Sequence, residues 1–411
     1  MRSRSRLLLV AGIAALAAVL VTASGALAAV APSTAASPAM GKYIVVLKDS
    51  VGSPAAVAAR QTRSLGGQVG LVYSSALKGY SATLPVASLQ ALRSDPQVAY
   101  VNEDRPVSVD AQTLPTGINR IDGELSSTVS GDGSGSVNVD VAVIDTGIST
   151  SHPDLNVVGG KVCNGTTFND KNGHGSHVAG IIAARDDAQG VVGVAPGARL
   201  WAVRVLGPNG SGSFSQVICG VDFVTANAGT IEVANMSLGG SGFDPGTGCS
   251  TGDALHDSIC RSVQAGVTYV VAAGNSHADA STQVPAAYDE VITVSALADF
   301  NGLPGGGAPA TCRSDVDDTF ADFSNFGSDI DLIAPGVCIL SDYKGTGFAT
   351  LSGTSMASPH VAGAAALYKS THPGDTPAQV KSALIGAGNF NWNNADDPDG
   401  IKEPLVNVDA F

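Results

Sequence analysis

Charged residues are scarce in this sequence of 411 residues, and few of them are positive. Only 14% of the residues are charged, whereas 44% are hydrophobic, and this balance suits a chain that buries a large core. The 22 lysines and arginines are outnumbered by 36 aspartates and glutamates. A protein with this deficit of positive charge does not bind nucleic acid by neutralising phosphates, so we predict no nucleic-acid partner. The excess of carboxylates is compatible with bound cations.

Two sequence patterns are also missing. The 50 glycines follow no Gly-X-Y period, which excludes a collagen-like chain. No C-x-x-C occurs, which argues against a structural zinc site. The even number of cysteines predicts three disulfides, and Cys249–Cys260 is the favoured pair because it closes a short polar loop. All six cysteines follow residue 110, and they are Cys163, Cys219, Cys249, Cys260, Cys312 and Cys338.

Positive charge gathers near the N-terminus, where residues 1–110 carry a net charge of +5 against −19 for residues 111–411. Three arginines precede an apolar stretch and the sequence Ala26-Leu27-Ala28, a pattern typical of a secretory signal peptide and its cleavage site. The alternative is a membrane anchor, but the stretch ends in Ala, Gly and Ser rather than Leu and Ile. We therefore expect residues 1–28 to direct secretion, and the mature protein to be extracellular and free of the membrane.

A small domain is predicted after a linker at residues 29–40, which consists mainly of Ala, Pro, Ser and Thr. The order β-α-β-β-α-β is that of an α+β ferredoxin-like domain. This part of the chain has no histidine and no cysteine, so we expect no catalysis in it. Its expected elements are strands at 43–47, 68–73, 77–84 and 98–101 and helices at 55–65 and 86–93.

From about residue 137 short, continuous apolar runs alternate with helical stretches. Runs without polar alternation indicate strands buried on both faces, and hence a parallel sheet covered by helices. We therefore predict a three-layer α/β domain over residues 111–411, with a junction at 107–120. The expected strands are 139–144, 200–206, 233–236, 267–273 and 291–295.

Three short segments each place one reactive side chain at a strand end or a helix start. Asp145 ends an apolar run, and His174 and Ser355 each open a helix of small residues, the second with Pro359 in its first turn. Each residue alone has an ordinary explanation as a turn or capping residue. Together they supply the parts of nucleophilic acyl transfer, because serine needs a base and the base needs a buried carboxylate. A serine at a helix N-terminus also places its own N–H near the developing oxyanion.

The motifs Val-Ile-Asp-Thr-Gly, His-Gly-x-His-Val-Ala-Gly and Gly-Thr-Ser-Met-Ala-x-Pro-His, in this order, resemble the active-site motifs of the subtilisin-like serine proteases. The sequence around Ala111-Gln112-Thr113 is similar to the mature start of the proteinase K branch. One departure is Ser176, where the family usually has threonine, and it retains the hydroxyl. The resemblance implies a monomeric endopeptidase made as a zymogen, with residues 29–110 containing a prodomain that inhibits its own catalytic domain. Cleavage after Asp110 and cleavage after Ala111 both fit the junction.

The resemblance also implies the roles of individual residues. Ser355 is the expected nucleophile, His174 the general base and then acid, and Asp145 the residue that orients His174. Asn275 is the expected oxyanion donor. The expected substrate is a protein or peptide, cleaved broadly after apolar or aromatic residues. Its main chain would bind as an extra strand beside glycine-containing segments, where the two backbones can approach closely. The implied substrate-binding residues are Gly210, Gly212, Ser237, Leu238, Gly239, Ala273 and Gly274.

A structural calcium ion, with no catalytic metal, is the implied cofactor. Calcium takes carboxylate and carbonyl oxygens. The segment 324–327 resembles one that precedes a calcium-binding Asp in the proteinase K branch, which implies Asp331 as a side-chain ligand. The carbonyl oxygens of Asp289 and Val291 are the other implied ligands. In the alternative interpretation Asp331 only forms hydrogen bonds within a loop.

Two other functions are weighed against proteolysis. An inactive, peptide-binding homologue would keep the groove, but all three triad residues are present. An esterase or lipase of the α/β-hydrolase type would require G-x-S-x-G. Ser355 lies in Gly353-Thr354-Ser355-Met356-Ala357, which lacks the second glycine.

Overall fold

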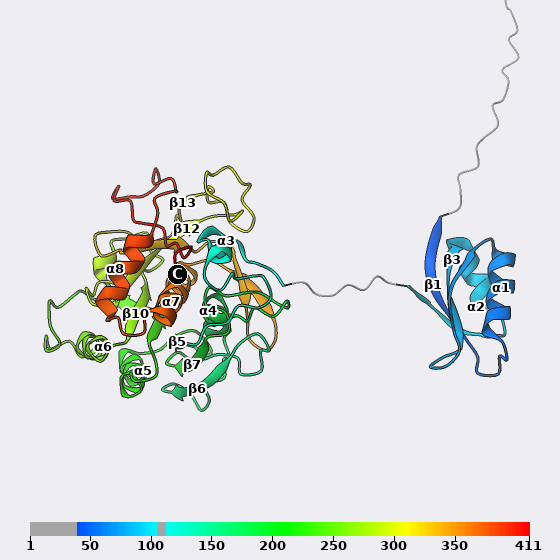
Figure 1. Ribbon diagram of the computed structural model, residues 1–411, viewed down its shortest axis with the longest axis horizontal. Coiled ribbons are helices and arrows are strands. Elements are labelled where there is room, and N and C mark those ends of the chain that lie inside the picture. The colour runs from blue at the N-terminus through cyan, green and yellow to red at the C-terminus, as the bar shows by residue number, and fades with distance from the viewer. Residues whose placement is uncertain (1–38, 105–111) are drawn as a thin grey trace, which may run out of the picture. The chain divides into compact units, whose positions relative to one another are not determined.

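The computed structural model describes residues 39–104 and 112–411, which belong to two compact units (Figure 1). The predicted signal peptide at 1–28 and the predicted cleavage sites at Asp110 and Ala111 lie outside the described residues. Within the described ranges no helix combines the length and the apolar character needed to cross a membrane.

The N-terminal unit is a four-stranded antiparallel sheet in the order β2-β3-β1-β4. Ser53 caps α1 by accepting a hydrogen bond from the backbone N–H of Ala56, and Pro54 occupies the first turn, where a missing N–H costs nothing. The elements are β1 (Met40–Leu47), α1 (Pro54–Leu65), β2 (Gln68–Tyr73), β3 (Gly79–Pro85), η1 (Val86–Ser88), α2 (Leu89–Arg93) and β4 (Val98–Glu103). This order confirms the predicted β-α-β-β-α-β domain.

The second unit is built on one sheet in the order β13-β12-β10-β8-β5-β7-β6, with β14 also paired to β12. All these pairs are parallel except β12 with β13, which confirms the predicted parallel sheet. The strands are β5 (Asp140–Asp145), β6 (Val157–Val162), β7 (Arg199–Arg204), β8 (Val233–Met236), β10 (Thr268–Ala272), β12 (Ile292–Ala298), β13 (Thr319–Phe320) and β14 (Leu332–Pro335).

Helices cover both faces of this sheet. In β5, Val141 and Val143 belong to one core, and Ala142 and Ile144 belong to the other. Because successive side chains of a strand point to opposite faces, a strand buried on both sides has no polar alternation. The first core is closed by α4 (His174–Ala183), α7 (Thr354–Thr371) and α8 (Pro377–Ala387), and the second by α5 (Phe214–Ala226) and α6 (Ala254–Gln264). The predicted three-layer architecture is therefore confirmed.

Three disulfides join the six cysteines, as the even count predicted. The favoured pair, Cys249–Cys260, is present, and the other two bonds are Cys163–Cys219 and Cys312–Cys338. The smaller elements of this unit are α3 (Thr116–Arg120), η2 (Gly123–Leu125), β9 (Gly240–Ser241), η3 (Ala280–Thr282), β11 (Gln283–Val284), β15 (Ile339–Asp342) and β16 (Phe348–Leu351).

Candidate active site

Asp145 and His174 are in direct contact at the C-terminal end of β5. The Asp145 side chain is fully buried, and both of its oxygens lie 2.9 Å from His174 Nδ1. Burial opposes the charged form of His174, but the charge of Asp145, its hydrogen bond to the ring and the charge of Asp170 together outweigh burial and raise the pKa of the imidazole. Since Nδ1 is held by the carboxylate, Nε2 is the nitrogen that can accept a proton from another group.

The start of α4 is fixed to the end of β5 by a buried aspartate that sequence reasoning missed. Asp170 accepts hydrogen bonds from the backbone N–H groups of Gly173 (2.9 Å) and Ser176 (3.0 Å), which have no partner within the helix. It also accepts one from Thr146 Oγ1 at 3.0 Å, next to Asp145. A carboxylate four residues before His174 was the available signal for this capping role.

The hydroxyl of Ser176 both donates and accepts a hydrogen bond. It donates to Asp170 Oδ2 at 2.7 Å and accepts a hydrogen bond from the backbone N–H of Ser149 at 2.9 Å. A side chain at Gly175 would be impossible, since its Cβ would lie 2.2 Å from the carbonyl oxygen of Gly147. The helix that carries His174 can therefore approach the strand that carries Asp145 because residue 175 is glycine.

Ser355 lies in the first turn of α7, and its main chain is tied to Ser237. The Oγ of Ser355 donates to the carbonyl oxygen of Ser237 at 3.4 Å, and the Oγ of Ser237 donates to the carbonyl oxygen of Ser355 at 2.9 Å. Pro359 lies inside the helix rather than in its first turn, because α7 begins at Thr354. Proline has no N–H, so the carbonyl group four residues earlier, that of Ser355, is left free for Ser237.

The side-chain amide of Asn275 is oriented by residue 354. Its Oδ1 accepts hydrogen bonds from the backbone N–H of Thr354 (2.8 Å) and from Thr354 Oγ1 (3.0 Å), which leaves Nδ2 as a donor. The point that a Cβ on Gly353 would occupy lies 3.6 Å from Asn275 Nδ2 and 3.7 Å from the backbone nitrogen of Ser355. Two N–H donors therefore border the same small space in front of α7.

Two neighbouring cavities border these residues and share Leu238 and Gly239. The first, of about 630 Å³, includes His174, and the second, of about 180 Å³, includes Asn275 and Ser355. No aspartate, glutamate, lysine or arginine lines either cavity. Of the predicted substrate-binding residues, Gly210, Gly212, Ser237, Leu238 and Gly239 line the first, and Leu238, Gly239, Ala273 and Gly274 line the second. Sequence reasoning missed Leu206, Phe214, Val217, Gln283, Val284 and Ala286.

The predicted calcium ligands are bound to a lysine instead. Lys381 Nζ lies 2.8 Å from Asp331 Oδ2 and donates to the carbonyl oxygens of Val291 (2.7 Å) and Asp289 (3.3 Å). All three predicted ligands thus converge on one ammonium group, and the structure contradicts a calcium ion at the same point. The error has a simple origin, because Lys381 comes from α8, far along the chain from the other three residues.

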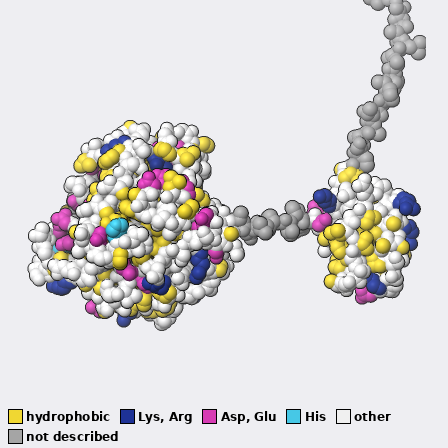
Figure 2. Space-filling view, in the orientation of Figure 1, with side chains coloured by type: hydrophobic (Ala, Val, Ile, Leu, Met, Phe, Trp, Pro, Cys, Tyr) yellow, Lys and Arg dark blue, Asp and Glu magenta, His cyan; other side chains and the backbone are white. Residues whose placement is uncertain are grey.

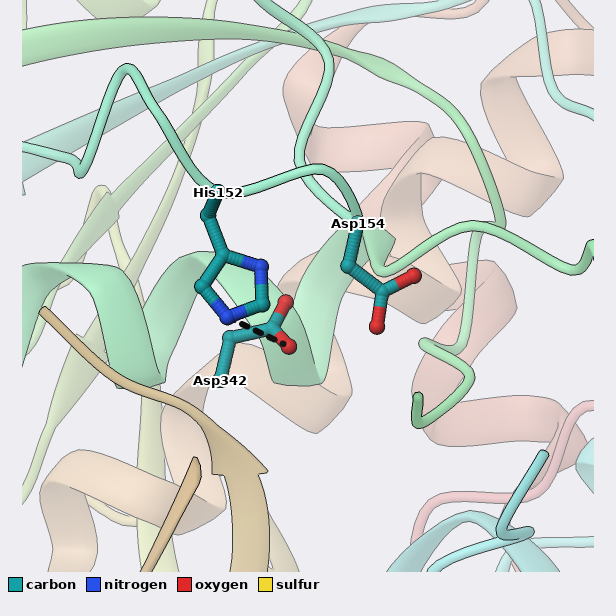
Figure 3. A group of neighbouring side chains, drawn as sticks. All are labelled: His152, Asp154 and Asp342. Carbon is teal, nitrogen blue, oxygen red and sulfur yellow. Dashed lines mark ion pairs between the residues drawn. The ribbon is translucent and has the colours of Figure 1, made fainter. Parts of the chain in front are cut away.

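Two other groups of described side chains bring possible metal ligands within 4.8 Å of one another. One consists of His152, Asp154 and Asp342 (Figure 3), and the other of Asp397, Asp399 and Glu403. The first mixes imidazole and carboxylate ligands, whereas the second offers carboxylate oxygens alone. The two groups therefore suit different classes of metal ion.

Comparison with known proteins agrees with this geometry. Residues 136–399 match the model of the Subtilase family, and residues 42–110 match that of Peptidase inhibitor I9. The chain is 38% identical over 376 residues to Subtilisin NAT of Bacillus subtilis subsp. natto, covering 90% of each protein. It is 40% identical over 366 residues to an extracellular serine proteinase of Thermus sp. (strain Rt41A), covering 85% of this chain and 80% of that protein.

A solved structure leads to the same family. The crystal structure of a cold adapted subtilisin-like serine proteinase is similar with a TM-score of 0.58 and 35% sequence identity, over 72% of this chain and 99% of that one. The chain therefore belongs to the subtilase family, as a subtilisin-like serine endopeptidase that carries an I9 inhibitor prodomain.

Proposed function

We propose that Ser355, His174 and Asp145 form the catalytic triad of this endopeptidase, and that Asn275 and the backbone N–H of Ser355 bind the oxyanion. The observation that carries the proposal is the contact of His174 Nδ1 with both oxygens of the buried Asp145, at the edge of a groove. An aspartate in this position holds the tautomer that leaves Nε2 free, and it stabilises the imidazolium that forms during reaction.

The reaction then proceeds by acyl transfer. Ser355 Oγ attacks the carbonyl carbon of the scissile peptide while its proton passes to His174 Nε2. The tetrahedral intermediate collapses, His174 protonates the departing amine, and an ester remains on Ser355. A water molecule, deprotonated by His174, attacks that ester and releases the acid, which restores the serine hydroxyl. Asp145 remains ionised throughout.

The oxyanion would form in the space bordered by Asn275 Nδ2 and the backbone nitrogen of Ser355. Thr354 fixes the amide through Asn275 Oδ1, so the donor is oriented before substrate arrives. Donors that need no reorganisation stabilise the charge that develops in the transition state more than the neutral carbonyl of the substrate. The position of Ser355 at the start of α7 adds the positive end of the helix dipole.

The substrate would bind as an extended strand along the backbone of residues 210–212 and 237–239. We assign the 180 Å³ cavity beside Ser355 to the side chain that precedes the scissile bond. Since no charged residue lines it, a lysine or arginine side chain buried there would lack a partner for its charge. Broad cleavage after apolar or aromatic residues follows. A peptide library would test this specificity, and a profile dominated by Lys or Arg would refute it.

The prodomain is proposed to inhibit the catalytic domain of its own chain until cleavage after Asp110 or Ala111. Its match to the I9 inhibitor family supports this role. Hydrophobic side chains gather on the visible face of this unit (Figure 2). Leu71 and Tyr100 are 68% and 53% exposed, on strands that α1 and α2 do not fully cover. We infer that these exposed apolar side chains take part in the inhibitory role of the prodomain.

Calcium is proposed at the group of Asp397, Asp399 and Glu403 instead of at Asp331. Asp397 and Glu403 are 8% and 2% exposed, and among the described residues no lysine or arginine forms an ion pair with either of them. Burial raises the pKa of Glu403 to about 8, which shows how poorly the ionised group is compensated by the protein alone. A set of carboxylate oxygens suits a hard cation. Calcium should therefore raise the melting midpoint, and Asp397→Asn should remove most of that gain.

Secretion as a monomer completes the proposal. Disulfides persist in oxidising surroundings, and all six cysteines are paired. The relative from Thermus is itself named an extracellular proteinase. Mass spectrometry of the culture medium should find the protein beginning at Ala111 or Gln112, and finding the protein only in the cell pellet would contradict export.

Labelling with a fluorophosphonate tests the enzymatic assignment directly. The reagent forms a covalent bond only with an activated serine, so the matured protein should be labelled at Ser355. The matched control is Ser352→Ala, which removes a nearby hydroxyl that accepts a hydrogen bond from the backbone of Cys338. Labelling should persist in this control and disappear in Ser355→Ala. A matured, folded protein without any labelling would instead favour the peptide-binding module.

A further inference from the structure

A tyrosine ring lies directly against the residue that precedes His174, outside the two substrate cavities. Tyr343 follows β15, and a Cβ on Gly173 would overlap two atoms of its ring. Asn172 and His174, on either side of Gly173, line the 630 Å³ cavity, whereas Tyr343 lines neither that cavity nor the one of 180 Å³. Tyr343 therefore adjoins the active site without belonging to the surface that we assign to the residues before the scissile bond.

The side chain of Lys344 is held beside this ring. Its Nζ lies 5.6 Å from the centre of the Tyr343 ring, within the range of a cation–π contact. The turn that carries both residues is fixed at two points. The backbone N–H of Tyr343 donates to the carbonyl oxygen of Gly347 at 2.6 Å, and Ser149 Oγ donates to that of Gly345 at 2.8 Å. Lys344 is exposed, but the fixed turn and the aromatic face limit where its ammonium group can lie.

The exposed charges on the two segments that meet here are both positive. In residues 169–174 the exposed charged side chain is Lys171, in residues 342–348 it is Lys344, and the aspartate of each segment is buried. Among the described residues neither lysine forms an ion pair. Since residues 111–411 carry a net charge of −19, the sign of the surface charge is reversed locally beside His174.

We propose that Lys344 selects an acidic side chain in the part of the substrate that follows the scissile bond. The inference rests on the proposed triad, because the direction of the substrate follows from it. Residues before the scissile bond occupy the two cavities, and His174 protonates the amine of the departing part. That part leaves the cavities, and past His174 it meets the surface formed by Tyr343 and Lys344. A carboxylate there would pair with the ammonium group, whereas a lysine would be repelled.

The expected preference is modest, because the ion pair with the substrate would be exposed to water. Exposed ion pairs change an equilibrium constant by up to about fivefold. We therefore expect kcat/KM for a substrate with Glu at the favoured position to exceed that for Lys by about fivefold. Salt should weaken this selection, since the Debye length falls to about 3 Å at 1 M salt. At that concentration the Glu and Lys substrates should be cleaved with nearly equal kcat/KM.

Internally quenched peptides test the proposal on the matured enzyme made from the full chain. All share the residues before the scissile bond, and each carries Glu, Gln or Lys at one of the positions after it. Mass spectrometry of the products verifies which bond is cleaved. In Lys344→Glu the preference should reverse, so that Lys is favoured over Glu, and in Lys344→Met it should vanish. The matched control is Lys161→Glu, at an exposed lysine of β6, which changes the net charge equally and should keep the parent's ratio.

An equal ratio of kcat/KM for Glu and Lys substrates in the parent and in Lys344→Glu would overturn the assignment. So would a ratio that changes in Lys171→Glu and not in Lys344→Glu, because the acidic residue would then bind beside Lys171. A preference that persists at high salt would also overturn it, since charge would not be the cause. Fluorophosphonate labelling distinguishes these results from a failure of the proposed triad. Labelled enzyme without the preference contradicts only the role of Lys344, whereas a matured protein without labelling or turnover contradicts the triad and this inference together.

Discussion

Replacing Lys381 by methionine should destabilise the catalytic unit by removing a cation that three oxygens share. The ammonium group contacts Asp331 Oδ2 at 2.8 Å and the carbonyl oxygens of Val291 and Asp289 at 2.7 and 3.3 Å. Hydrogen bonds to a charged group contribute about 1.5–3 kcal/mol each, and breaking a buried ion pair costs about 3–5 kcal/mol. The side chains of Lys381 and Asp331 are 25% and 17% exposed, so water compensates part of the loss.

We therefore expect the free energy of unfolding to fall by about 3 kcal/mol, which lowers the melting midpoint of a unit of this size by about 5 °C. The assay is differential scanning calorimetry of the full chain with Ser355→Ala. The matched control is Lys161→Met, since Lys161 is exposed on β6. The reasoning would be refuted if the melting midpoint of Lys381→Met fell below that of its parent by less than half of the expected shift.

A smaller side chain at the same position gives a second readout. In Lys381→Ala the three oxygens remain and the ammonium is gone, so a cation from solution can take its place. Calcium should then raise the midpoint of Lys381→Ala by more than it raises the midpoint of the parent. Adding Asp331→Asn should abolish this difference, because the only anionic ligand is removed. An identical calcium response in all three proteins would show that the site does not accept a metal ion even when vacant.

Three further predictions concern the proposed active site. Ser355→Ala should reduce kcat by about 10⁶, the loss known for such knockouts in subtilisin, and retention of a hundredth of the activity would dismiss Ser355 as nucleophile. Asn275→Ala should lower kcat by about 10²–10³ with little change in KM, as for the corresponding donor in subtilisin, and a change in KM alone would place the amide elsewhere. Because Asp145 raises the pKa of His174, kcat/KM should rise with pH through a midpoint above the pKa of a free imidazole. In Asp145→Asn the residual activity should also rise with pH, but the midpoint of that rise should lie at a lower pH. The stability that the charged contact supplies is present below the pKa of an unfolded histidine and is lost as pH rises through the folded value, which melting curves of the two proteins can check.

Much of the architecture could be predicted because it depends on local patterns. Apolar runs without alternation correspond to strands with a core on each face, and Val233–Met236 matches its prediction residue for residue. The ends of the strands were predicted less accurately. The strand predicted at 291–295 continues to Ala298, because pairing with β13 and β14 extends β12. Such pairing depends on distant segments, which a single stretch of sequence does not display.

In the proposed site, too, residues in local motifs could be predicted, whereas residues that meet only in the fold could not. Asp145, His174 and Ser355 stand in short motifs, so the sequence alone points to them. Asp170 and Lys381 do not, because their roles arise only when separate segments meet in the fold. The error at Asp331 is instructive, since the arrangement of oxygens was foreseen and the cation was not. A basic side chain of α8 has the reach to occupy a place that the local sequence suggests for a metal ion.

Pro359 has a consequence for how mutations in the cleft are interpreted. Because Pro359 has no N–H, the carbonyl oxygen of Ser355 accepts no hydrogen bond from it within α7. That oxygen accepts a hydrogen bond from Ser237 instead, on the wall of the substrate groove. The main chain of the proposed nucleophile is thus anchored to the surface that holds the substrate, and the helix alone does not determine its position. A displacement of that wall on binding is transmitted directly to the attacking residue. Substitutions designed to alter which peptides bind can therefore change the rate of the chemical step as well.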